Sequence, residues 1–455
     1  MSARFVNVDR DTPMLLPPSL KDWVAENDMV HFVIEAVEGM ELHGLKVNRQ
    51  GGGSPQYPPR MMLALLIYCY ANGIMSSRKI ERATWNLVSV RYLTGDTHPD
   101  HDTINSFRKA NKESIERLFT ELLILARNLG FLKVGTVSVD GTHIKANASK
   151  YKNVRYDRAG VLEKQIADDV AELLKNAEEA DTTEKVDGQS LPEEIGRREV
   201  LRQKMIQARL DMEERARERE KIRQEKEKSK REYPPDKKGS GRPKKERIDA
   251  EEAKPEDDDQ INLVDKDSTL CRKSRRDAWE QAYNAQAVVD ADGSRLILAS
   301  YVAESTSDRN ELEPALKAVV PEAGKPSVLL ADAGYVNTES IKRIEESEDG
   351  PELYIAVTSE DHGLRRYDYR PPKEPRKNEV KDPVLIAMRE KVLSEKGRKI
   401  YGKRKSTVEP VFGIIKSILG FRQFLRRGFG AVDSEWKLVC AGYNIKRLWT
   451  LQMAK

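Results

Sequence analysis

Apolar residues recur at helical spacing through the first 130 residues of the chain. One such run follows Asn27-Asp28, a pair that offers a helix N-cap, and it contains Val30, Val33, Ile34 and Val37. The stretch from Pro58 to Gly73 is apolar on nearly every side, which indicates a buried central helix. These patterns predict an all-α N-terminal domain over residues 1–130.

Basic side chains lie on the predicted outer faces of this domain. A helix from Ser76 to Arg82, a turn at 97–102 and a second helix carrying Arg108 and Lys109 could dock in a DNA groove. An ordinary helical bundle with solvated basic residues explains the same pattern. The cluster around the turn could ligate a metal or cap the helix, and it consists of His98, Asp100, His101 and Asp102.

The composition changes sharply between residues 150 and 262. An apolar stripe through Leu162, Ile166 and Val170 marks one helix, and a second candidate helix starts near Leu191. The second helix has a thin seam that gives way to alternating charges, so a coiled-coil-like hairpin and a partly solvated helix both remain open. Arg242 lies in a Gly-Arg-Pro segment of a basic arm that could enter a DNA minor groove or serve as a plain linker.

Strand patterns begin at Val134, where apolar and small polar residues alternate up to Asp140-Gly141. We expect the strand to end there in a turn, with Asp140 at its carboxyl end. Further strands are predicted at 283–289, 296–302, 327–330 and 353–358, with helices at 309–319 and 337–346. Without the insertion, this order is that of an α/β RNase H-like mixed sheet flanked by helices, which predicts a catalytic domain over 131–455 interrupted at 150–262.

Two carboxylates follow strands that this order makes neighbours. Asp332 comes directly after the strand at 327–330. The first and fourth strands lie together at the centre of such a sheet, so Asp140 and Asp332 should meet although they are far apart in the chain. Two adjacent carboxylates repel each other unless a cation binds between them.

A third acid, Glu409, stands alone among basic residues near the C-terminus. On a helix, Lys405, Glu409, Phe412 and Lys416 share one face. The following segment, FRQFLRRGF, alternates Arg422, Arg426 and Arg427 with phenylalanines, a pattern that suits phosphate contact and base stacking.

The composition of the 455 residues is that of a soluble protein, with 34 % charged residues and a net charge of +4. Three scattered cysteines are too few for a disulfide framework or a zinc site. No apolar signal core or membrane span is evident in the sequence. We therefore expect a cytoplasmic protein.

The chain resembles a DDE transposase of a bacterial insertion sequence. The stretches that carry the resemblance are VSVDGTHIKANAS, YNAQAVVD, RNELEP, LLADAGYVN and VEPVFGIIK, together with PDHDTINSFRK in the N-terminal domain. The resemblance implies that Asp140, Asp332 and Glu409 form a catalytic, metal-binding triad for Mg²⁺, with Mn²⁺ as a substitute.

Relatives often carry the signature Tyr-x2-Arg-x3-Glu-x6-Lys, from which this chain departs. Glu409 and Lys416 keep their spacing, but Lys405 rather than Arg404 has the spacing from arginine to glutamate, and Tyr401 is one residue too far away. The resemblance implies DNA contact for Lys416 and, less directly, for Tyr401, Arg404 and Lys405.

The implied function is metal-dependent cleavage at the ends of a mobile element, followed by strand transfer into target DNA. The implied partners are double-stranded DNA and a second copy of the chain in a synaptic dimer, and the implied location is the bacterial nucleoid. Two alternatives stay open, namely an RNase H-like nuclease without strand transfer and a non-catalytic DNA-binding protein. End sequences, target preference and the outcome of transposition cannot be read from the chain.

Overall fold

The computed structural model describes residues 19–42, 44–46, 56–182, 191–232, 249–272, 277–357 and 380–455. The chain divides into two compact units. The sheet unit comprises Met1–Thr142, Asn284–Arg422 and Gly430–Lys455, and the hairpin unit comprises His143–Tyr283 and Gln423–Phe429. The domain boundary predicted at residue 130 stays a prediction.

The described N-terminal part of the sheet unit is helical, as predicted. Its elements are the 3-10 turn η1 (Leu20–Trp23) and the helices α1 (Met29–Gly39), α2 (Pro59–Ala71), α3 (Ser77–Asn86), α4 (Val88–Thr94), α5 (His101–Ala110) and α6 (Lys112–Asn128). Asp28 caps α1 by accepting a hydrogen bond from the backbone N–H of Val30 at 2.8 Å. Helix α2 is buried along most of its length, because its residues are apolar on every side.

The histidine and aspartate cluster near residue 100 caps a helix. The Asp100 side chain accepts from the backbone N–H of Thr103 at 2.7 Å and so begins α5. Within the described ranges, no group of three or more His, Cys, Asp or Glu side chains could hold a metal ion. The hydrogen bond of Asp100 therefore confirms the capping interpretation.

The central sheet has the predicted RNase H-like order. Its core strands are β1 (Thr136–Lys145), β5 (Glu280–Asp290), β6 (Ile297–Ala303), β7 (Val328–Ala331) and β8 (Glu352–Ile355), and a short sixth strand, β4 (Thr269–Cys271), pairs with β5. Strand β1 lies between β5 and β7, β8 extends the sheet beyond β7, and β6 pairs with β5. The β1–β7 and β7–β8 pairs are parallel, whereas β5 and β6 form an antiparallel hairpin. The first and fourth strands of the core are thus neighbours, as predicted.

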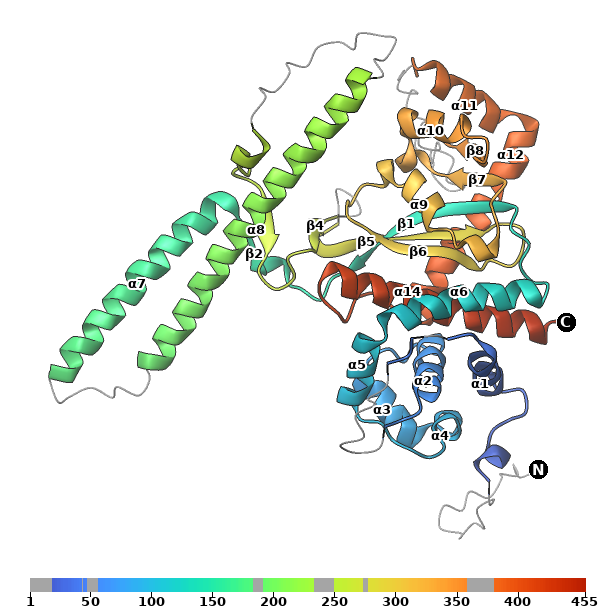
Figure 1. Cartoon of the computed structure of the whole chain (residues 1–455), viewed down its shortest axis with the longest axis horizontal. Coiled ribbons are helices and arrows are strands. Elements are labelled where there is room, and N and C mark those ends of the chain that lie inside the picture. The colour runs from blue at the N-terminus through green and yellow to red at the C-terminus, as the bar shows by residue number, and fades with distance from the viewer. Residues whose placement is uncertain are drawn as a thin grey trace, which may run out of the picture. The chain divides into compact units, whose positions relative to one another are not determined.

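Helices and short turns connect and cover these strands. They are η4 (Asp308–Asn310), α9 (Leu312–Ala318), η5 (Pro321–Ala323), η6 (Ala333–Tyr335), α10 (Thr338–Glu345), α11 (Pro383–Leu393), α12 (Glu395–Gly402), η7 (Arg404–Ser406), α13 (Val408–Gly413), a π-helical turn (Ile414–Ile418) and α14 (Phe429–Met453). Helix α14 packs on the β5–β6 hairpin, where the Trp436 indole N–H donates to the Gln286 carbonyl at 2.9 Å (Figure 1). The Asn444 side chain pairs with both backbone groups of Ile297.

The hairpin unit contains two long helices that lie side by side, α7 (Tyr156–Thr182) and α8 (Leu191–Glu232) (Figure 1). Its shorter elements are η2 (Lys150–Lys152), β2 (Asn153–Arg155), η3 (Ala250–Glu252), β3 (Gln260–Asn262) and β4 (Thr269–Cys271). Ile166 packs with Met205, Ala208 and Met212, which confirms the predicted seam. Leu201 of α8 is exposed.

Arg242, predicted in the basic arm, lies outside the described residues. Among the helices that the structure describes, none combines the length and the apolar character that crossing a bilayer requires.

Candidate active site

Asp140 and Asp332 lie at the ends of the parallel pairing between the two central strands. The register matches Ser138 of β1 with Leu330 of β7, and Asp140 and Asp332 each come two residues after this pair. Asp332 follows the last residue of β7 and caps η6, because its Oδ1 accepts from the backbone N–H of Gly334 at 2.8 Å. The sheet therefore brings the two acids together across 192 positions of sequence, as the strand order predicted.

The turn predicted at Asp140-Gly141 is wrong. Strand β1 continues through Gly141 to Lys145, with Ile144 buried. The reason lies in tertiary packing: a Cβ at Gly141 would fall 2.6 Å from Oδ1 of Asp308 and 2.9 Å from Oδ1 of Asn284. The glycine thus provides room for neighbouring side chains inside a strand rather than making a turn.

One guanidinium nitrogen of Arg404 bridges the two aspartates. Its Nη2 lies 3.2 Å from Oδ2 of Asp140 and 3.3 Å from Oδ2 of Asp332. The Arg404 side chain is only 10 % exposed, and among the described residues its Nε has no hydrogen-bond partner. The carboxylates of the sheet therefore converge on a single cationic group.

Burial and charge shift the pKa values of these groups. Burial raises the pKa of Asp140 to about 7; Arg404 acts in the opposite direction, whereas Asp332 and Asp308 raise it further. Burial alone would lower the pKa of Arg404, but Asp140 and Asp332 outweigh it and keep that pKa above its ordinary value. The acids and the guanidinium thus form one coupled electrostatic site.

Glu409 lies in the first turn of α13 and is exposed. It is close enough to contribute to the raised pKa of Arg404, after the contributions of Asp140, Asp332 and Tyr401. It does not form a three-acid cluster with the two aspartates, since no such cluster exists in the described part of the chain. Helix α13 is short and lies between the 3-10 turn η7 and a π-helical turn, an irregular arrangement that is frequent at functional sites.

The structure shows which of the two neighbouring basic residues faces the acids. Arg404 is buried against them, whereas Lys405 is exposed. Tyr401 is only 9 % exposed and packs with Leu330 and Tyr354 in an apolar cluster. Its ring is therefore a core element, and its predicted DNA contact stays a prediction.

Lys416 reaches β1 from the π-helical turn. Its Nζ contacts the Thr142 hydroxyl, two residues beyond Asp140. Its ammonium group therefore lies beside the strand that carries the first acid, although Lys416 and Thr142 are 274 positions apart.

Two of the three aromatic rings in the segment FRQFLRRGF are not available for base stacking. Phe421 and Phe424 are buried, with Phe421 stacked near Trp436 and Phe424 edge-on to Tyr283. For these two rings the predicted base stacking is wrong, because they fill core positions. Arg422 and Arg427 remain exposed at the surface, and Arg426 is partly exposed.

Arg108 was predicted to point outward from α5, and this is also wrong. It is 5 % exposed and donates to the Tyr70 hydroxyl at 2.7 Å, so it anchors α5 to the buried helix α2. Lys109, the next residue, is exposed. Arg108 lies four residues after the buried Ile104, so both residues share the buried face of α5.

Three residues at this site were not predicted from the sequence, namely Asn284, Gln286 and Asp308. Asn284 and Gln286 lie on one face of β5 and are buried, and both donate to Oδ1 of Asp308, at 2.8 and 2.6 Å respectively. Gln286 also accepts a hydrogen bond from Tyr335 of η6, next to Asp332. The available signal was two polar residues alternating within an otherwise apolar strand, YNAQAVV.

The aspartates are suited to a hard divalent cation. Both offer carboxylate oxygens, the ligands that Mg²⁺ prefers, and both already lie within 3.3 Å of one cationic nitrogen. Arg404 would have to yield to an ion there, and Glu409 would have to approach to join the same coordination sphere.

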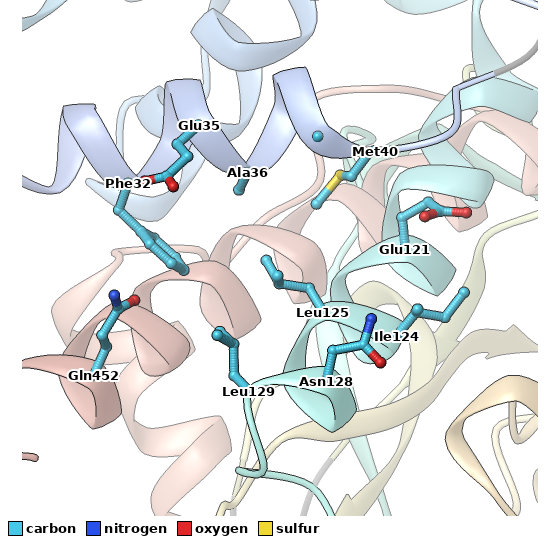
Figure 2. A pocket seen from close by; sticks show the side chains of 11 residues that line it. Phe32, Glu35, Ala36, Met40, Glu121, Ile124, Leu125, Asn128, Leu129 and Gln452 are labelled. Carbon is cyan, nitrogen blue, oxygen red and sulfur yellow. The ribbon is translucent and has the colours of Figure 1, made fainter.

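A separate pocket of about 300 Å³ lies among the N-terminal helices and α14 (Figure 2). Phe32 and Glu35 of α1, Glu121 and Leu125 of α6, and Gln452 of α14 line it. None of the candidate active-site residues contributes to it. The acidic site is therefore not part of this pocket.

Comparison with known families matches two parts of the chain. Residues 18–110 match the family described as Transposase domain (DUF772), and residues 256–445 match the family described as Transposase DDE domain. Comparison with curated proteins and with solved structures found no match. Asp332 and Glu409 lie within the matched ranges, whereas Asp140 lies outside them and is linked to the site by the pairing of β1 with β7. With both matches and the RNase H-like sheet, the chain belongs to the DDE transposases of insertion sequences, which act on DNA.

Proposed function

We propose that this transposase cleaves DNA at the ends of its mobile element and joins the freed ends to target DNA at one metal-dependent site. The observation that carries the proposal is the convergence of Asp140 and Asp332 on Arg404 at the centre of the sheet. Carboxylates held so close together on rigid strands favour binding of a compensating cation.

A bound pair of divalent ions would activate the attacking oxygen and stabilise the leaving oxygen of the phosphodiester. Asp140 and Asp332 would hold the ions from the sheet, with Mg²⁺ as the natural ion and Mn²⁺ as a substitute. Glu409 would complete the ligand set by a shift of α13. The irregular turns on both sides of that short helix support such a movement.

The cationic side chains around the acids would bind the phosphates that flank the cut. Lys416 is well suited to this role because its ammonium group lies beside Thr142, close to the first acid. Arg404, once displaced from the aspartates, would add a planar group able to make two hydrogen bonds to one phosphate. Lys405 would contact DNA from the surface.

The exposed basic residues would extend the DNA contact beyond the cut. On this proposal Arg422, Arg426, Arg427 and Lys109 bind backbone phosphates without reading the sequence. Two element ends must be held together for joining, so we propose that two copies of the chain act in a synaptic dimer at the nucleoid.

The direct test is to incubate the full chain with DNA that carries its element's ends, target DNA and Mg²⁺. Nicks that leave a 3′-hydroxyl, followed by joined products, are expected. Nicks without joined product would favour the nuclease without strand transfer. DNA binding without any nick would favour the non-catalytic alternative.

Three substitutions assign the acids in the same assay: Asp140→Asn, Asp332→Asn and Glu409→Gln. Losing one preorganised electrostatic contact at a reacting centre costs about 10²–10³ in rate, so each variant should lose at least that much cleavage. Asp349→Asn changes an exposed acid paired with Lys325 and is the matched control. Retained cleavage in any of the three variants would remove that residue from the site.

A further inference from the structure

Asp308 is a fourth acid at the site, contributed by the turn η4 between β6 and α9. A Cβ added to Gly141 would lie 2.6 Å from Oδ1 of Asp308, and one added to Gly334 would lie 3.7 Å from its Oδ2. These two glycines directly follow Asp140 and closely follow Asp332. Asp308 therefore lies between the chain segments that carry the two catalytic aspartates.

Two buried amides hold the Asp308 side chain. Both Asn284 and Gln286 donate a hydrogen bond to Oδ1 of Asp308. Within the described residues, these are the hydrogen bonds of this carboxylate, and none reaches Oδ2. Gln286 is 0 % exposed and Asn284 is 2 % exposed, which makes their donated hydrogen bonds costly to lose. One oxygen of Asp308 is thus fixed by β5, while the other faces the loop of Asp332.

The same amides reach the loop of Asp332. The Tyr335 hydroxyl donates to Oε1 of Gln286, and Tyr335 is fully buried in η6, the turn that Asp332 caps. Strand β5 is the sheet neighbour of β1, which carries Asp140. A continuous chain of hydrogen bonds therefore connects η4, β5 and the turn that begins at Asp332.

We propose that Asp308, held by Asn284 and Gln286, is a positioning residue that fixes Asp332 relative to Asp140 and strengthens divalent-cation binding between them. The inference rests on the proposed function, because it needs these aspartates to bind the cation. Asp308 acts from outside the ligand set: its charge favours a cation nearby, and its hydrogen bonds limit the movement of the loop.

The test is titration of the full chain with Mn²⁺ by calorimetry in the absence of DNA. Asp308→Asn keeps an oxygen that can accept from the amides but removes the charge. Loss of a supporting group around a metal typically weakens binding about 10–100-fold, and we expect that weakening here. The thermal unfolding midpoint should be nearly unchanged, and raised Mn²⁺ should restore DNA cleavage.

Further variants separate charge from general damage. Asp308→Glu keeps the charge and should bind Mn²⁺ more tightly than Asp308→Asn. Gln286→Met fills a similar volume but cannot donate, so it should weaken Mn²⁺ binding even if Asp308→Asn fails to fold. Glu304→Gln removes an exposed acid from the same connection and should leave the affinity unchanged.

The outcomes distinguish this inference from the proposed function. If Asp140→Asn abolishes Mn²⁺ binding while Asp308→Asn and Gln286→Met bind as tightly as the unchanged chain, only the inference is overturned. If the unchanged chain binds no Mn²⁺, or Asp140→Asn binds it equally well, the metal site of the proposed function fails and the inference fails with it.

Discussion

The central sheet and the α7–α8 hairpin are held together in different ways. In the sheet, Leu329, Leu330, Leu353 and Ile355 are fully buried, and β7 pairs with β1 across 192 positions of sequence. In the hairpin, the apolar seam is narrow, and large side chains such as Val200 remain exposed. Stability contributed by burial is therefore concentrated in the sheet, where the proposed catalytic acids need rigid support.

Charge pairs take up much of the surface of the hairpin. Arg209 pairs with Glu163 across the two helices at 2.7 Å, and Arg198 pairs with Asp169 at 3.3 Å. Exposed pairs of this kind contribute about 0–1 kcal/mol each. We therefore expect local opening of the hairpin to cost less free energy than opening of the sheet.

The largest expected difference between the two regions comes from deleting one buried leucine side chain. Leu353→Ala in β8 should lower the free energy of unfolding by about 2–5 kcal/mol, because a close-packed sheet cannot fill the cavity. Leu162→Ala in α7 should lower it by no more than about 1 kcal/mol, because Leu162 is only partly buried. Urea unfolding measures both, and equal losses would contradict the comparison.

Asp290 in the sheet and Asp259 in the hairpin unit should respond oppositely to pH. Burial raises the pKa of Asp290 in the sheet, although Ser294 hydrogen bonds oppose the shift. Its stabilising contribution is therefore complete below the unfolded pKa of about 4 and declines as pH rises through the folded pKa. Asp290→Asn lacks this titration, so the stability of the unchanged chain relative to the variant should fall as pH rises above about 4.

Asp259 in the hairpin unit has the reverse sign. Burial alone would raise its pKa, but Arg219 and the backbone N–H of Glu256 outweigh it and lower the pKa. Its contribution is present above the unfolded pKa of about 4 and is lost as pH falls through the folded pKa. Relative to Asp259→Asn, the unchanged chain should therefore lose stability on acidification. Unfolding curves at several pH values measure how the stability difference between the unchanged chain and each variant changes with pH. A change of the same sign for Asp290 and Asp259 would contradict the expected difference.

A smaller effect is expected from the pair that joins the two hairpin helices. Glu163→Gln should reduce stability by about 0.2–1 kcal/mol at low salt and by less at high salt, because exposed charges are screened. A double-mutant cycle with Arg209→Gln isolates the pair, and a coupling that does not change with salt would show that the pair is not held by exposed charges.

The smallest expected effect on the sheet comes from removing the hairpin helices. The chain enters and leaves them side by side, since the Tyr156 N–H donates to the Asp259 carbonyl at 2.8 Å, so residues 157–257 can be replaced by a short Gly-Ser turn. Most of the helical circular dichroism from α7 and α8 should disappear, while the main thermal transition should move by only a few degrees. A collapse of that transition would show that the sheet depends on the hairpin.

Much of the fold follows from local pattern. The alternation that ends at Asp140 and the apolar run before Asp332 located the central strands, and their order predicted that the two acids meet. The apolar stripe through Leu162, Ile166 and Val170 suggested a helical hairpin, although a partly solvated helix stayed open. Such patterns are readable because a strand or helix repeats its exposure over a fixed period.

Individual side-chain orientations were less predictable. Lys405 has the expected spacing from Glu409, yet Arg404 faces the acids, because a 3-10 turn and a break at Thr407 change the rotation of the chain before α13. Phe424 and Arg108 looked like surface residues by their neighbours but fill buried positions. Irregular turns and packing partners from distant segments do not follow a period.

By itself, the sequence determined the order of helices and strands and the meeting of Asp140 with Asp332, and it marked the insertion between them as charged and helical. Only the tertiary structure decided that Arg404 bridges the acids, that Gly141 stays within a strand, and that Asp308 lies beside the segments of Asp140 and Asp332. The physical reason is range: periodic burial is set by neighbours in the chain, whereas the direction of a charged side chain depends on the cations, amides and cavities that distant segments bring to it.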